Sequence, residues 1–428
     1  MQALRMLMSR YYAILFTLLL ALGANAQIQV HALISSIKTL KAERLSSTTL
    51  ERPFLVLKDG FVDGSEEENT LHISFDEMSH DVHFYTYTLL HLDRDGQTSN
   101  ITSNEYLRGF TTAEISDYSH SLNTAIEYTH YQFDFPNPNM QLTASGRYRL
   151  LIYEDNNPDK QVAYVDFMVV DPCVQVVPQL RYNTQREING RYQQLDIDVR
   201  LSAVNVRDPQ EISLVVEQNN RSDNRVTITQ PTFIQGDVLR YVNQPALIFE
   251  GGNEYRHLDC FSTYLAGTNI DRIAYMNGAY HALLFPDEAR TNNQLYIHEF
   301  DSDGQFIVNA ERTNDIDTEA EYMWVHWLLP EKLHPDGTFY VGGDLFENRM
   351  TEANRMSYDS EYGCYYLTAP VKQGGYDYQY WFVEKSKKTA TTQRSEGSHW
   401  ETENKYAIYV YYRPFGSRYD QLVGLTLL

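Results

Sequence analysis

Apolar and polar residues alternate with a period of two along most of the chain. In LHISF, the apolar residues Leu71, Ile73 and Phe75 share one face, and LDIDVRL at 195–201 places charged residues between apolar ones. Because successive side chains of a strand point to opposite faces, this pattern predicts short strands with one buried face. Further runs of this kind occupy residues 148–153, 162–170, 226–229 and 406–412.

Turn sequences separate these runs. Stretches rich in Asp, Asn, Pro and Gly occur at 93–96, 156–159, 301–304 and 334–337. Short alternating runs between such turns are typical of β-sandwiches. Helical periodicity is absent apart from possible single turns. We therefore predict an all-β chain of tandem immunoglobulin-like β-sandwich domains.

Two stretches predict the limits of three modules. In VVDPCVQVVP at 169–178, a predicted strand ends and a connector that contains two prolines begins. The polar stretch 311–322 separates two apolar runs. The predicted division is a first sandwich at 27–170, a second β domain at 171–315 and a third sandwich at 316–428. The order of strands and aromatic residues in the third module resembles early-set immunoglobulin-like domains.

The first 26 residues have the pattern of a secretory signal peptide. Arg5 and Arg10 precede the apolar run 11–22, and Ala24 and Ala26 are the small residues of a cleavage site between Ala26 and Gln27. The run is too short for a typical membrane span, although an uncleaved anchor is the alternative. Because no later stretch approaches 18 apolar residues, we expect no transmembrane segment in the mature chain.

Charge and cysteine content narrow the classes of partner. The formal net charge is −22 without clustered basic residues, which argues against nucleic acid and anionic membrane surfaces as partners. The three cysteines, Cys173, Cys260 and Cys364, show no metal-binding spacing. We expect them to be small apolar residues in or near cores, or one disulfide with a leftover thiol.

Catalytic and cofactor motifs are not found in the sequence. It contains no GxSxG elbow, no HExxH and no Gly-rich loop opening a helix. Calcium loops starting at Asp93 or Asp301 would end at Asn104 or Arg312 instead of the required Glu. A glycosidase pair of carboxylates could come from anywhere in the chain. We predict a protein that is not an enzyme, with no catalytic residues, metal, cofactor or small-molecule substrate.

The stretch EISDYSHSLNTAIEYTHYQFDFPNPNM at 114–140 concentrates tyrosines, histidines and hydroxyl residues. Its two histidines, His120 and His130, have no nucleophile or metal partner at a recognisable spacing. We therefore interpret the stretch as an ordered excursion between strands of the first module. The sequence leaves open whether its tyrosines face inward to hold this excursion or outward to hold a partner.

Ten blocks stand in order along the whole mature chain, at 37–40, 73–78, 85–93, 104–110, 116–137, 145–155, 218–220, 251–259, 372–380 and 401–424. Together they resemble the type IX secretion system plug proteins of Bacteroidota. The family pattern often has a Cys and a downstream Trp near 91–96, where this chain has Leu92 and Gly96. The resemblance implies a periplasmic, all-β accessory protein associated with the outer membrane. It further implies a partner, the outer-membrane type IX translocon barrel protein, whose periplasmic opening the protein binds and plugs.

Five aromatic residues of the first module are candidates for contact with this partner, because reversible binding favours a Tyr-rich interface. The alternative for each is packing or hydrogen bonding within the module. These candidates are Tyr106, Phe110, Tyr118, Tyr128 and Tyr131.

A second interpretation is a carbohydrate-binding or glycan-processing periplasmic β-sandwich protein. It rests on the early-set-like third module and the acid-rich composition. Trp381 or Trp400 could stack on a sugar ring if exposed, and otherwise we expect these aromatic residues to fill the core of a sandwich.

Overall fold

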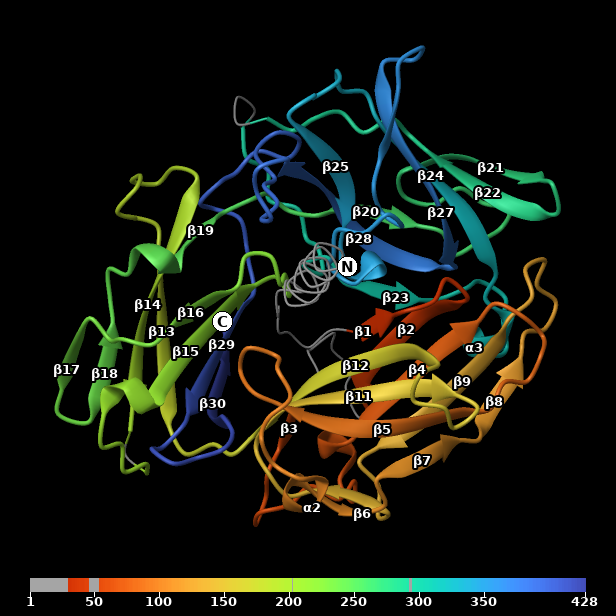
Figure 1. Cartoon of the computed structure of the whole chain (residues 1–428). Coiled ribbons are helices and arrows are strands. Elements are labelled where there is room, and N and C mark those ends of the chain that lie inside the picture. The colour runs from red at the N-terminus through yellow and green to blue at the C-terminus, as the bar shows by residue number, and fades with distance from the viewer. Residues whose placement is uncertain (1–29, 46–53, 202, 292–294) are drawn as a thin grey trace, which may run out of the picture.

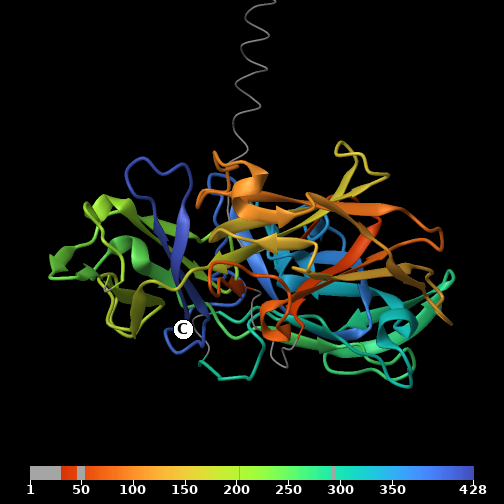
Figure 2. The ribbon, with the colours of Figure 1, turned by 90° about the horizontal axis from the view of Figure 1, so that it is seen from below.

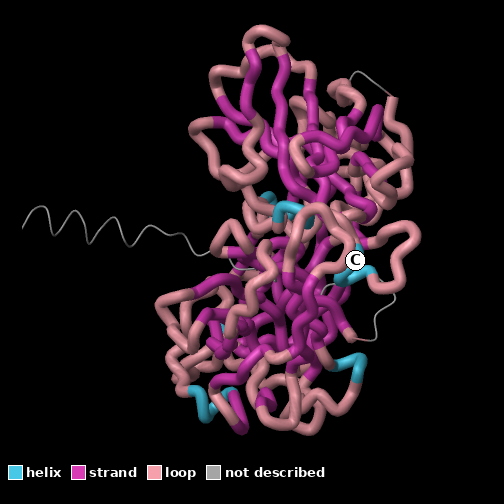
Figure 3. Tube along the Cα trace, turned by 90° about the vertical axis from the view of Figure 1, so that its right-hand side faces the viewer, coloured by secondary structure: helices cyan, strands magenta, loops and turns pink. Residues whose placement is uncertain are grey.

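Three two-sheet sandwiches make up the protein. The computed structural model describes residues 30–45, 54–201, 203–291 and 295–428. The predicted signal peptide and the Ala26–Gln27 cleavage site lie outside the described residues. Strands dominate the described residues, with only short helical segments between them (Figure 3). The predicted all-β class of packed sandwiches is confirmed.

The first sandwich packs a sheet of order β1-β12-β11-β5-β7 against a sheet of order β2-β4-β9-β8. Its core contains Leu71, Ile73 and Phe75, all fully buried, as their alternation predicted. β3 joins β12 in parallel, and β6 pairs with β10. The elements are β1 (Val30–Ala32), β2 (Ile37–Arg44), β3 (Phe54–Val56), η1 (Glu67–Asn69), β4 (Leu71–Glu77), β5 (Tyr85–Leu92), α2 (Ser103–Tyr106), β6 (Leu107–Gly109), β7 (Thr112–Ile115), β8 (Asp117–His120), β9 (Thr129–Phe135), β10 (Met140–Leu142), β11 (Gly146–Glu154) and β12 (Gln161–Val170).

The second sandwich packs a sheet of order β13-β14-β18-β17 against a sheet of order β16-β15-β29-β30. Leu195, Ile197 and Val199 of β14 are fully buried in its core. The elements are β13 (Gln175–Arg181), β14 (Tyr192–Arg200), η2 (Pro209–Glu211), β15 (Ile212–Gln218), β16 (Val226–Ile228), β17 (Phe233–Gln235), β18 (Val238–Tyr241), η3 (Pro245–Leu247), β19 (Ile248–Glu250), β29 (Tyr406–Tyr412) and β30 (Gln421–Leu427).

The third sandwich packs β28 and its neighbours against a sheet of order β21-β22-β24-β27-β26. β28 pairs with β20, β23 and β25 along its length. The elements are β20 (Arg256–Asp259), β21 (Ile270–Met276), β22 (Ala279–Leu284), β23 (Phe306–Val308), α3 (Ile316–Glu319), β24 (Tyr322–Leu329), β25 (Gly337–Gly342), η4 (Asp344–Phe346), β26 (Ser357–Asp359), β27 (Cys364–Lys372) and β28 (Gly374–Glu384).

Strand pairing divides the chain differently from the predicted ranges. The first module ends with β12 at Val170, at the predicted limit. β20 to β23, expected in the second domain, pair within the third sandwich, and the polar stretch 311–322 supplies α3 instead of a linker. β29 and β30, expected in the third, complete the second sandwich through β15. The last strands therefore lie beside the second module, where Figure 1 shows them in dark blue among green strands.

The first and second sandwiches share an apolar contact. β29 buries Tyr406, Ile408 and Val410 in the core of the second sandwich and turns Tyr409 and Tyr411 to the opposite face. That opposite face packs on β12, which is why the run 406–412 is apolar almost throughout. Figure 2 shows the second sandwich extending to the left of the first.

Candidate interaction surface

Three of the five candidate aromatic residues are buried. Tyr106 is 6% exposed and donates its hydroxyl to the Leu89 carbonyl at 3.0 Å. Tyr131 is fully buried, stacks on Phe75 at 5.3 Å and accepts a hydrogen bond from the His83 amide. These two side chains hold the first sandwich together and are not available as surface contacts.

Tyr128, also fully buried, reaches into the third module. Its hydroxyl lies 2.8 Å from the Ala320 carbonyl and 3.1 Å from the Asp317 carbonyl, to which it donates. The ammonium of Lys372 lies 4.3 Å from its ring centroid, a cation–π geometry. The predicted contact with an outside partner is therefore corrected to a contact between modules, because burial leaves Tyr128 no surface.

The stretch 114–140 docks the first module onto the third. β8 and β9 form a hairpin, and residues at its tip contact the segment around α3. The amides of Ala125 and Ile126 donate to the carboxylate of Glu321, at 2.5 and 3.1 Å, and the Leu122 amide donates to the Thr318 carbonyl. The excursion is ordered, as expected, and backbone amides at its tip bond to another part of the same chain.

A buried charge network completes this junction. Asp76 of β4 contacts Lys372 of β27 at 2.7 Å, and both Tyr322 and His130 donate to its carboxylate at the same distance. Burial by itself raises the pKa of Asp76, but Lys372 and His130 outweigh it and leave that pKa below its ordinary value. A carboxylate already engaged by three groups is a structural element and a poor general base.

The other two candidate aromatic residues are exposed. Phe110 is 66% exposed and Tyr118 is 42% exposed. Phe110 follows Gly109, whose φ of +106° and close approach to the Asn139 carbonyl exclude a side chain there. The Phe110 amide donates to that same carbonyl at 2.8 Å. A fixed backbone thus presents the Phe110 ring to solvent.

Phe110 precedes the open edge of the first sandwich, which we define as β7 and β8, and Tyr118 lies within β8. Each of these two strands is the last strand of its sheet, so no described strand pairs with its outer side. All four residues of β8 are exposed. Strands of this kind can accept an added strand or a polar, aromatic contact from a partner.

Two further exposed apolar residues at this edge were missed by sequence reasoning. Val82 is 40% exposed and Phe84 is 66% exposed, immediately before β5, which pairs with β7. The Phe84 carbonyl accepts a hydrogen bond from Asp155, which fixes its backbone. Both residues precede the alternating run of β5, so the period-two pattern carries no signal for them.

The aromatic residues proposed for sugar stacking do not form an open platform. Trp381 is fully buried, with the Arg221 guanidinium 4.6 Å from its ring centroid. Trp400 is half-buried against Tyr182, with ring centroids 4.8 Å apart. The structure therefore gives the glycan-binding interpretation no open aromatic platform at these two residues.

Cys173, Cys260 and Cys364 are unpaired thiols, and burial raises the pKa of each. No group of three or more His, Cys, Asp or Glu side chains within the described ranges could hold a metal ion. Among the helices that the structure describes, none has the length and apolar character needed to cross a membrane.

Comparison with known proteins identifies the family. A crystal structure of a hypothetical protein from Parabacteroides merdae superposes with a TM-score of 0.89 at 33% identity, covering 94% of this chain and 99% of that chain. No curated protein matches significantly. The family model of the type 9 secretion system plug protein first domain matches residues 37–171, which indicates a role in type 9 secretion at the cell envelope, with partners in that system. The chain belongs to the family of type 9 secretion system plug proteins.

Proposed function

We propose that this protein is a non-catalytic periplasmic accessory protein of the type IX secretion system. It binds the periplasmic opening of the outer-membrane translocon barrel and plugs it. The observation that carries this proposal is the match of residues 37–171 to the plug-protein family. That match covers the first sandwich, which contains the open edge.

Two buried contacts between the sandwiches support a plugging role. A stopper must keep its shape against a large pore. The apolar contact between β12 and β29 joins the first two sandwiches, and the buried Asp76–Lys372 pair joins the first to the third. Both contacts restrict motion between modules, because opening either one would expose apolar or charged groups that are now buried.

The open edge supports the proposal as the contact surface. A stopper that must release binds reversibly, which favours a moderately sized, wet interface with aromatic residues. Phe110, Tyr118 and Phe84 supply such residues on a polar surface. Their rings are held by ordered backbone, so little conformational entropy is lost on binding.

Affinity purification tests the binding step. A tagged translocon barrel protein purified from outer membranes should recover the wild-type protein. The double variant Phe110→Ala/Tyr118→Ala should be recovered in clearly lower yield, whereas Phe415→Ala, which removes a 99% exposed ring from the second sandwich, should match wild type. Consistent absence of the wild-type protein from the purified translocon would sink the proposal. Equal recovery of the wild-type protein and both variants would reject only the open edge as the contact.

A permeability assay tests the plugging step separately. Cells lacking the protein should take up a large dye or antibiotic that the intact outer membrane excludes. Expression of the wild-type protein should restore the barrier. The protein could be recovered with the translocon while cells that lack it keep an unchanged barrier. That result would show a bound accessory protein that does not act as a plug.

A further inference from the structure

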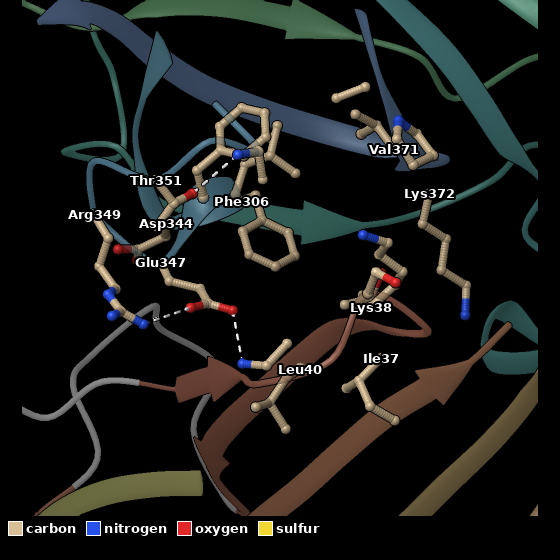
Figure 4. Close-up of a pocket in the computed structure, with 18 of the residues that line it drawn as sticks. Ile37, Lys38, Leu40, Phe306, Asp344, Glu347, Arg349, Thr351, Val371 and Lys372 are labelled. Atoms are coloured by element: carbon tan, nitrogen blue, oxygen red, sulfur yellow. Dashed lines mark hydrogen bonds and ion pairs between the residues drawn. The ribbon is translucent and has the colours of Figure 1, made fainter. Parts of the chain in front are cut away.

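A cavity of about 510 Å³ lies between the first and third sandwiches. Residues 32–40, from β1 to β2, form one wall, and the η4 segment, Phe306 and the end of β27 form the other. Figure 4 shows Ile37, Lys38 and Leu40 on the first wall facing Phe306 and Val371 on the second. This volume falls within the range of small-molecule sites in proteins, roughly 300–1,000 Å³.

The backbone on both walls adopts uncommon conformations. β2 has a register irregularity between Lys38 and Lys41, and Thr39 within it has a φ of +47°. A β-branched residue in the left-handed region is a genuine outlier, and bulges re-aim neighbouring side chains. On the facing wall, Glu347 and Asn348 have φ values of +58° and +49°. Such strain persists only where the surrounding structure holds it, and it gathers at binding sites.

Lys38 is the side chain that this bulge directs into the cavity. It rises from β2 toward the ring of Phe306 (Figure 4). Its ammonium forms no hydrogen bond or ion pair with any residue that the structure describes, although it feels the charge of Glu347. Burial lowers the pKa of Lys38, and the charge of Glu347 opposes this shift. An anion bound beside the ammonium would raise that pKa again.

The other charged groups around the cavity already have partners. Lys372 pairs with Asp76, and Arg349 contacts Glu347 and His31. Glu352 pairs with Arg355, and Asp344 accepts a hydrogen bond from the side-chain amide of Asn348. Glu347 also accepts a hydrogen bond from the Ala32 amide at 2.9 Å and lies 3.0 Å from Nδ1 of His31. Lys38 is therefore the one lining cation without a partner among the described residues, and apolar side chains such as Ile37, Phe306 and Val371 lie on the cavity walls with it.

We propose that this cavity binds a carboxylate carried on an apolar group. The Lys38 ammonium pairs with the carboxylate, and the apolar group packs against Phe306, Ile37 and Val371. A single ammonium matches a monovalent carboxylate better than a phosphate, which recruits several donors. The carboxylate could belong to a small free acid or to the C-terminus of a peptide, which present the same chemistry. This proposal does not depend on plugging of the translocon.

Calorimetric titration with matched ligands tests the proposal. The small-acid arm compares 3-phenylpropionate with 3-phenylpropionamide, and the peptide arm compares a pentapeptide ending in phenylalanine with its C-terminal amide. In at least one arm the acid should bind about tenfold or more tightly than the amide, because a charge-assisted hydrogen bond is lost. The arm that shows this preference identifies the source of the carboxylate.

Variants assign the preference to Lys38. Lys38→Gln should bind acid and amide equally weakly, and Lys38→Arg should restore the preference for the acid. Lys332→Gln, at an exposed lysine of the third sandwich, should behave as wild type. An unchanged thermal unfolding midpoint shows that Lys38→Gln is folded. Equal binding of acid and amide to the wild-type protein, no binding of any of the four ligands at millimolar concentration, or a preference retained in Lys38→Gln would each overturn the proposal.

Discussion

Lys372 of the third sandwich places its ammonium 2.7 Å from Oδ2 of Asp76 in the first, with both side chains at most 2% exposed. The two residues are 296 positions apart in the sequence. The same Asp76 oxygen accepts a hydrogen bond from Tyr322, also in the third sandwich. This junction therefore depends on a charge pair that has no access to solvent.

Removing one partner of this pair should destabilise the protein strongly. We expect Lys372→Met to lower the free energy of unfolding by about 3–5 kcal/mol, because Asp76 would be left as an uncompensated buried charge. The double variant Asp76→Asn/Lys372→Met should lose less than the sum of the two single changes. Urea denaturation measures these differences. Lys332→Met, at an exposed lysine, is the control, and a loss in Lys372→Met no larger than in this control would contradict the prediction.

The Tyr128 hydroxyl should contribute to the same junction. We expect Tyr128→Phe to cost about 1–3 kcal/mol of unfolding free energy, since the buried carbonyls of Asp317 and Ala320 lose a donor. Tyr118→Phe removes a hydroxyl from a 42% exposed side chain and should be close to neutral. Limited proteolysis offers a second measurement, because a weakened junction should be cut more rapidly around α3. Equal stability of the two variants would show that the Tyr128 hydroxyl is dispensable.

Gly109 should tolerate no side chain. A Cβ at this position would lie 2.0 Å from the Asn139 carbonyl oxygen, and the residue has a positive φ. We expect Gly109→Ala to cost about 3 kcal/mol, from backbone strain and overpacking together. Gly60→Ala is the matched control, because Gly60 also has a positive φ but nothing lies within 4 Å of its Cβ position. Thermal unfolding should show the larger loss in Gly109→Ala, and the reverse order would disprove the role of the Asn139 contact.

Glu396 should make the third sandwich sensitive to acid. Burial by itself raises its pKa, but Arg256 and Arg290 outweigh this effect and lower the pKa to about 2, from an ordinary value of 4.5. The ionised form is therefore stabilised in the folded state. Its contribution is fully present above pH 4.5 and is lost as the pH falls toward 2.

Comparing Glu396→Gln with a control variant isolates the contribution of Glu396 to the pH dependence of the unfolding free energy. The stability difference between wild type and Glu396→Gln should shrink by about 3 kcal/mol across this pH window. Glu352→Gln, at an exposed carboxylate paired with Arg355, should show no such change. Denaturant titrations at several pH values provide the measurement. A difference between wild type and Glu396→Gln that stays constant with pH would rule out the depressed pKa.

Local pattern predicted much of the secondary structure. The runs 71–75, 148–153 and 406–412 lie in strands, and the run 195–201 does so up to Arg200. The turns at 93–96 and 301–304 contain the positive-φ glycines Gly96 and Gly304. These features are decided by neighbouring residues, because side-chain alternation and turn conformation extend over a few positions only. Among the five candidate aromatic residues, pattern alone did not separate the exposed Phe110 and Tyr118 from the three that are buried.

The sequence by itself determined the all-β class, the positions of these strands and turns and the family. Only the tertiary structure decided which strands share a sheet: β29 pairs with β15, far away in the sequence, and not with the neighbouring β28. It also decided that Tyr128 and Asp76 face another module and that Lys38 faces a cavity. The physical reason is that alternation marks two faces of a strand but not what covers each face. That covering is set by packing between segments that are distant in the chain.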